Sequence, residues 1–271
     1  MKIKNLLMMA ALAACTILTG CGGQEGGGND KAANSGQKIV VGLDDEFPPM
    51  GFRDEKNNIV GFDVDLAKEA AKRLGREVEF KAIDWSSKEA ELKSKRIDVL
   101  WNGLDITPER EENMLFSDPY MENRQIVFVR KGETPGSIAN GEGLNGLTVG
   151  TQAASTAEAY FNENEGIKNG MKELKTYGDY TSALMDLENG RLDAVVCDEI
   201  VGRYYISKHP EKLEALDITI GPISQFGIAF RKDDTALRDE VQKVFDEMVK
   251  DGAAKKISEQ WFGKDLLKTK Q

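Results

Sequence analysis

From residue 38 onward, short apolar runs alternate with stretches in which apolar residues recur every three or four positions. The run at 39–42 predicts a strand, and Asp63 to Leu74, with Val64, Ala67, Ala70 and Leu74 on one face, predicts a helix that Gly75 ends. Strands are also expected at 78–80 and 97–100, with a helix at 88–95 between them. This strand–helix alternation favours a parallel α/β sheet.

A second series of the same order follows a glycine-rich break at 141–146. It comprises strands at 147–149, 173–175 and 193–197 and helices at 155–161 and 180–187. Two lobes of similar architecture are therefore expected, with a ligand site in the cleft between them. At the C-terminus, Leu237, Val241, Val244, Met248 and Val249 make one helix face, and Ile257 and Trp261 belong to a final helix. We interpret these C-terminal apolar residues as packing.

The composition is that of a globular chain, with 271 residues of which 40% are hydrophobic. The formal net charge of −10 argues against nucleic acid as a partner, because phosphate binding depends on an excess of Lys and Arg. After the N-terminal segment, no apolar run approaches the roughly 20 residues of a transmembrane helix.

Residues 1–21 have the pattern of an export signal, with Lys2 and Lys4 preceding a short uncharged apolar run. The end of this segment, Leu18-Thr19-Gly20-Cys21, resembles the lipobox of bacterial lipoproteins, which implies cleavage before Cys21 and a lipid, palmitate included, on that residue. The alternative is an ordinary secretory signal. Residues 22–36 are interpreted as a flexible tether with a reach of roughly 20 Å. Cys197 then has no disulfide partner, and we expect it to be a small buried hydrophobe.

The segment 101–110 presents the most distinctive chemistry of the chain. We expect the strand at 97–100 to run into a loop in which Pro108 stops the strand ladder and keeps Thr107 extended. Asp105 and Arg110 would then lie beyond the end of a strand, where α/β sheets bind ligands. An anion and a cation held together suit a zwitterion such as a free amino acid. The alternative is that Asp105 and Arg110 face solvent or pair with each other.

Polar and aromatic residues also follow the other predicted strands. Ser155 to Glu158 form a capping box, in which the Ser155 hydroxyl accepts from the Glu158 N–H and Glu158 reaches back to the Ser155 N–H. A helix start of this kind attracts carboxylates, although it can also be a plain cap. Asp198 is the counterpart of Asp105 in the second series. Asp44, Phe47 and Trp85 lie at comparable strand ends, where they could instead cap a turn or be half-buried core.

Several other chemistries are not supported. The glycine pattern at 141–146 matches G-x-G-x-x-G, but a strand follows it and none closely precedes it, so we interpret it as a linker. With His209 as the single histidine, neither a metal site nor a histidine-based triad can be assembled. No cofactor is expected.

Several motifs in the right order resemble the extracytoplasmic solute-binding proteins of the polar amino-acid family (family 3), which serve ATP-driven importers. The signature helix is matched by Gly61-Phe62-Asp63-Val64-Asp65-Leu66. Further motifs are matched by Thr107-Pro108-Glu109-Arg110, Phe116-Ser117-Asp118-Pro119-Tyr120 and Trp261-Phe262-Gly263. The resemblance covers nearly all of residues 38–263.

The resemblance implies a role for each site residue. Arg110 falls on the arginine that grips the ligand α-carboxylate, and Thr156, beside Ser155, falls on its second-lobe partner. Asp198, with Gly103 and Asp105, would bind the α-amino group. The remaining site residues fall where the family holds the ligand side chain: Phe47 and Trp85 as an aromatic sandwich, and Asp44 at its far end.

Two positions depart from the family pattern. The family commonly has Ser or Thr where this chain has Asp105, and the same substitution occurs in members that bind arginine. An extra carboxylate there should strengthen ammonium binding. The family has Gly where this chain has Ala154, which puts the backbone conformation beside Ser155 in doubt.

The implied fold is a two-lobed, periplasmic-binding-protein-like (type II) clamshell, with lobe 1 at 37–125 and 222–271 and lobe 2 at 126–221. Closure around a free amino acid, arginine or lysine first and glutamine or cystine as alternatives, would precede docking on an ABC permease. We expect a monomer, lipid-anchored outside the cytoplasm, with no enzymatic activity. The alternative classes are a dehydratase-like enzyme on the same fold and a tethered amino-acid sensor.

Overall fold

The computed structural model describes residues 38–139 and 141–268. The predicted signal peptide, the tether and the lipidation residue Cys21 therefore lie outside the described residues. Within the described ranges, no helix has both the length and the apolar character needed to cross a membrane.

Strands and helices alternate along most of the chain. The strands are β1 (Ile39–Leu43), β2 (Glu46–Phe47), β3 (Gly51–Arg53), β4 (Ile59–Val60), β5 (Val78–Ala82), β6 (Val99–Asp105), β7 (Met114–Phe116), β8 (Met121–Arg130), β9 (Thr148–Gln152), β10 (Glu173–Tyr177), β11 (Ala194–Asp198) and β12 (Leu213–Arg231). The helices are α1 (Phe62–Leu74), η2 (a 3₁₀ turn, Trp85–Ser87), α2 (Lys88–Lys93), α3 (Pro108–Asn113), α4 (Gly136–Ala139), α5 (Thr156–Glu163), α6 (Glu165–Gly170), α7 (Tyr180–Glu188), α8 (Glu199–Lys208), α9 (Thr235–Lys250) and α10 (Ala253–Phe262).

Both predicted βαβαβ series form parallel strands. β1 pairs in parallel with β5 and β6, and β9 pairs in parallel with β10 and β11. Over the described residues, the main sheet has the order β10-β9-β11-β8-β12-β6-β1-β5, with β7 on β12. The predicted α/β class is confirmed. Because parallel neighbours align their carboxyl ends, the ends of β1, β6, β9 and β11 present the candidate residues.

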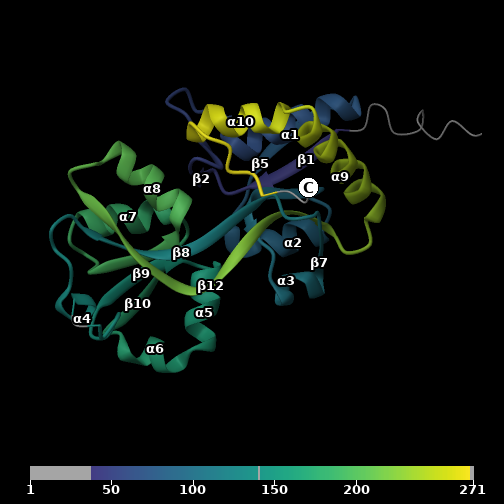
Figure 1. Ribbon diagram of the computed structural model, residues 1–271. Coiled ribbons are helices and arrows are strands. Elements are labelled where there is room, and N and C mark those ends of the chain that lie inside the picture. Colours follow the sequence, from purple (N-terminus) through teal and green to yellow (C-terminus); the bar gives the residue numbers. More distant parts are fainter. Residues whose placement is uncertain (1–37, 140, 269–271) are drawn as a thin grey trace, which may run out of the picture. The chain divides into compact units, whose positions relative to one another are not determined.

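Two long antiparallel strands, which periodicity did not predict, connect the two parallel groups. β8 and β12 pair with each other, and β8 then pairs with β11 while β12 pairs with β6 (Figure 1). The predicted lobe limits at 125/126 and 221/222 fall inside these two strands. The main sheet therefore continues through both groups, and the exact limits of the lobes stay a prediction.

The helices bury the faces that their sequences predicted. α1 buries Val64, Ala67 and Ala70 and ends at Gly75, whose left-handed backbone (φ 67°) suits glycine. α9 packs against α1 and α10 and buries Leu237, Val241, Val244, Phe245 and Met248. Each such side chain contributes about 1.5–3 kcal/mol when fully buried. Cys197 is a free, fully buried thiol in β11, as predicted.

The segment 101–110 differs from its predicted form. Trp101 to Asp105 continue β6, and Pro108 begins α3, so the expected loop is wrong. β12 supplies a ladder partner beyond residue 100, with Phe226 opposite Asp105. Proline fits the first turn of a helix because its missing N–H has no intrahelical partner there. Thr107 is extended (φ −130°, ψ 152°), as expected, and its hydroxyl caps α3.

Candidate functional site

Two buried carboxylates meet where β6 and β11 end. Asp105 and Asp198 are 3% and 5% exposed, and the Asn123 side-chain amide donates to both. Gln125 donates to Asp198 at 2.9 Å. Among the described residues, no Lys or Arg forms an ion pair with either carboxylate. We call this cluster of Asp105, Asp198, Asn123 and Gln125 the acidic end.

The negative charges of the acidic end are destabilised by burial and by their mutual repulsion. Burial, together with the negative charge of Asp105, raises the pKa of Asp198 to about 7. Asp105 also accepts from the Thr156 hydroxyl at 2.6 Å and from the Ser224 hydroxyl at 2.7 Å. The first of these bonds joins the end of β6 to the start of α5, so it connects the two parallel groups. A ligand ammonium would supply the positive charge that this cluster lacks.

A buried guanidinium lies on the other side of Asp105. Arg110, on α3, is 8% exposed and donates to the main-chain carbonyls of Asp105 (2.9 Å) and Ala154 (3.4 Å). It does not pair with the Asp105 carboxylate, which removes that alternative. Among the described residues no carboxylate lies within ion-pair distance of Arg110, so its guanidinium retains donors for an anion.

The start of α5 forms the predicted cap with one difference. The Ser155 hydroxyl accepts from the Glu158 N–H at 3.1 Å, as predicted. Glu158, however, reaches back to the N–H of Ala154 (2.6 Å) and not to that of Ser155. Ala154 is left-handed (φ 55°), a conformation that costs a non-glycine residue about 1–2 kcal/mol. This explains why a glycine suits the position.

Two aromatic rings stand nearly parallel beside this region. Phe47, on β2, and Trp85, in η2, have centroids 6.5 Å apart with an interplanar angle of 11°. Gly103 lies against Phe47, because a Cβ there would approach Phe47 Cε1 to 2.8 Å, and its φ of 55° also favours glycine. The three predicted residues are thus neighbours in space.

Asp44 follows β1 and is 6% exposed. It accepts from the Gln152 side chain at 2.7 Å and from the Glu46 N–H at 2.9 Å. Burial raises the pKa of Asp44 to about 7. Because Gln152 lies at the end of β9, this bond is a further connection between the two parallel groups.

The structure therefore brings Asp105, Asp198 and Thr156 into one hydrogen-bonded cluster. Arg110 donates to the carbonyl of Ala154, and Ser155 follows Ala154 in the chain. Phe47, Trp85 and Gly103 form the aromatic part, and Asp44 joins through Gln152. Their roles toward a ligand stay predictions.

Residues that the sequence analysis did not single out complete the network. Asn123 and Gln125 are buried amides on β8, but each follows a charged residue, so no alternation of polar and apolar residues marked them in the sequence. Asp63 is fully buried and accepts from the Gly103 N–H (2.7 Å) and the Tyr120 hydroxyl (2.9 Å), so it holds the strand that carries Gly103. Lys88, at the start of α2, is 4% exposed and gave no sequence signal because it begins an otherwise polar helix.

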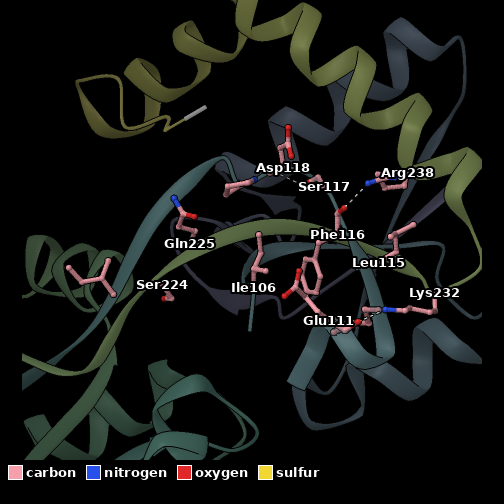
Figure 2. A pocket seen from close by; sticks show the side chains of 13 residues that line it. Ile106, Glu111, Leu115, Phe116, Ser117, Asp118, Ser224, Gln225, Lys232 and Arg238 are labelled. Carbon is pink, nitrogen blue, oxygen red and sulfur yellow. Dashed lines mark hydrogen bonds between the residues drawn. The ribbon is translucent and has the colours of Figure 1, made fainter. Parts of the chain in front are cut away.

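A separate hollow lies near β7 and α3 (Figure 2) and contains none of the predicted residues. It has a volume of about 560 Å³, and its lining includes Phe116, Lys232 and Arg238. Its cations already bind main-chain carbonyls, Lys232 that of Glu111 and Arg238 that of Phe116. The predicted site residues lie at the strand ends and outside this hollow.

Comparison with known proteins agrees with the fold. Residues 39–264 match the family model described as bacterial extracellular solute-binding proteins, family 3. The chain belongs to this family. The family's members lie outside the cytoplasm by that description, and the relatives below are named as binding proteins.

Three relatives illustrate the range within family 3. The L-cystine-binding protein TcyJ of Escherichia coli (strain K12) is 32% identical over 85% of this chain and 84% of its own length. The ABC transporter arginine-binding protein 1 of the same strain is 31% identical over 96% and 99%. An ABC uptake transporter substrate-binding protein from Streptococcus pneumoniae, solved with bound histidine, is 34% identical over 86% and 95%, with a TM-score of 0.80. The two-lobed fold is thereby confirmed.

Proposed function

We propose that this chain binds a free polar α-amino acid outside the cytoplasm and delivers it to an ABC permease. The single observation that carries the proposal is that two carboxylates and one guanidinium are buried close together without counter-ions. Asp105 and Asp198 have no described cation as ion-pair partner, and Arg110 has no described carboxylate. An amino acid carries an ammonium and a carboxylate on one carbon, so it would complete both ends at once.

Closure of the two lobes is part of this proposal. Hydrogen bonds from Thr156 to Asp105 and from Gln152 to Asp44 join the two parallel groups directly. A ligand held between Arg110 and the start of α5 would bind fully only when these groups approach each other. The long strands β8 and β12 are the natural hinge, because they are the connections between the groups.

A basic side chain is the first candidate for the ligand. A planar group between two parallel rings needs ring planes about 7 Å apart, twice the ~3.5 Å contact distance. The nearly parallel rings of Phe47 and Trp85 have centroids 6.5 Å apart, so their planes are at most about that far apart and the rings would separate slightly to admit a planar group. A guanidinium there would gain cation–π attraction and could reach Asp44. Glutamine and cystine remain the alternatives. The arginine-binding relative supports a basic ligand, and the cystine-binding relative supports cystine.

We propose that the protein is anchored to the membrane by its N-terminus. Cys21 would carry a lipid, palmitate included, and the tether would keep a monomeric binding domain near the membrane that holds the permease. The domain would perform no chemistry, since binding of an ammonium already accounts for the paired acids.

A thermal-shift panel of the twenty amino acids with cystine and ornithine tests the proposal. A ligand at one hundred times its Kd adds about 2.7 kcal/mol to the free energy of unfolding, which raises Tm by about 5–10 °C for a domain of this size. We expect the largest shifts with arginine, lysine or ornithine. If no amino acid shifts Tm, the transport function is wrong.

A further inference from the structure

A second buried cation accompanies Arg110. The ammonium of Lys88 donates to the main-chain carbonyl of Ala154 at 3.0 Å, the same oxygen that accepts from Arg110 at 3.4 Å. Lys88 and Arg110 are 4% and 8% exposed. The two cations therefore converge on one atom directly before Ser155 and Thr156, the start of α5.

The protein does not neutralise this pair. Across the residues that the structure describes, neither cation has a carboxylate within 4.0 Å, and Glu158 on α5 accepts from the Ala154 N–H. Glu89, Glu109 and Glu158 attract the Lys88 ammonium only from a greater distance. Burial, followed by the charge of Arg110, lowers the pKa of Lys88 to about 8. A carbonyl dipole thus compensates the ammonium less well than water does.

Two of the three N–H donors of Lys88 have hydrogen-bond partners, and its Nζ also lies over the Trp85 ring, 5.0 Å from the centroid. An ammonium has three N–H donors, and those of Lys88 meet the carbonyls of Trp85 (3.3 Å) and Ala154. The N-terminus of α5 adds partial positive charge on the other side of Ala154. Two cations and a helix start at one place, without an anion, are the arrangement that a carboxylate would complete.

We propose that Lys88 is a ligand-contacting residue that shares the α-carboxylate of the bound amino acid with Arg110. The inference rests on the proposed function and adds a residue to it. Because the contact is to the carboxylate, Lys88 contributes to every α-amino acid ligand regardless of its side chain.

Calorimetric binding of two ligand pairs to Lys88→Met tests this role. The pairs are L-arginine with L-argininamide and L-histidine with L-histidinamide, in which the amide lacks the carboxylate charge. Methionine keeps the apolar stem of the side chain, so packing is retained. Lys93→Met, on the exposed end of the same helix, is the matched control.

We expect Lys88→Met to weaken binding of each amino acid by about tenfold or more and to weaken binding of the amides much less. Unchanged Tm without ligand checks that the variant folds. An equal loss for acid and amide would assign Lys88 a structural role and overturn the inference, as would unchanged affinity. A wild-type protein that binds no amino acid would overturn the proposed function as well, so the two failures are distinguishable.

Discussion

The site has a negatively charged and a positively charged end, and at both ends uncharged polar groups hydrogen-bond to the buried charges. At the acidic end, Asp105 and Asp198 are held by the neutral amides of Asn123 and Gln125. At the cationic end, Lys88 and Arg110 are held by main-chain carbonyls, and they share that of Ala154. Dipoles orient each buried charge without neutralising it.

The two ends differ in whether a change of protonation can remove the buried charge. A carboxylate can take up a proton, and the pKa of Asp198 rises to about 7 accordingly. Arg110 stays protonated near neutral pH because it is a guanidinium, whereas Lys88, whose pKa is lowered to about 8, can lose its proton above that pH. The charge of Arg110 should therefore depend on the ligand alone for compensation, whereas the charges of Asp198 and Lys88 can also change with pH.

The largest effect is expected from removing Arg110. Arg110→Ala leaves the ligand carboxylate without its guanidinium, and truncating one partner of a buried charged pair costs about 2–5 kcal/mol. We expect calorimetry to show a loss of affinity of at least about thirtyfold, with Tm of the free protein nearly unchanged. Arg96→Ala, at an exposed arginine, is the control. Retained affinity in Arg110→Ala would mean that the carboxylate site lies elsewhere.

A smaller effect is expected from Asp198→Asn, because the amide keeps one oxygen to accept from an ammonium. The loss should be about 1.5–3 kcal/mol, the value of a hydrogen bond to a charged group. The same experiment compares Asp198→Asn with Asp233→Asn, an exposed acid.

The pH dependence of binding distinguishes the two ends further. A raised pKa means that protonated Asp198 is favoured below pH 7, and a proton there competes with the ligand ammonium. The affinity of the wild-type protein should therefore increase from pH 5 to pH 7, below the pKa of about 8 at which Lys88 would lose its proton, and Asp198→Asn should reduce this increase. Asp44, whose pKa is also about 7, would account for what remains if the ligand side chain is cationic. A pH profile unaltered by the substitution would contradict the role of Asp198.

The smallest effect concerns the carbonyl at which the cations meet. Ala154→Gly relieves a left-handed alanine but adds freedom to the unfolded chain, so the net gain in the free energy of unfolding should be about 0.5–1 kcal/mol. Urea denaturation measures it. Ala153→Gly, at a residue without positive φ, should instead destabilise the protein by a similar amount. If both substitutions destabilise equally, Ala154 is not strained.

Much of the fold could be predicted from local patterns. Periodicity located both βαβαβ series, because helices such as α1 and α7 bury one face and strands such as β1 and β11 are short apolar runs. The long strands β8 and β12 were missed for two reasons. The parts that run between the two parallel groups are polar, and the two strands pair in antiparallel fashion with residues distant in the sequence. The segment 101–110 was misassigned because β12, remote in the chain, supplies the ladder that continues β6 to Asp105.

The sequence by itself determined the residue types at the strand ends: Asp44, Asp105 and Asp198 as acids, Arg110 as a cation and Ser155 as a helix cap. These follow from local rules, since a strand end or a cap involves only neighbouring residues. Only the tertiary structure decided that Arg110 binds the carbonyl of Asp105 and not its carboxylate. It also decided that Lys88, an unremarkable lysine in a polar helix, reaches the start of α5. Such contacts join residues far apart in the chain, and no local pattern encodes which buried charge lacks a partner.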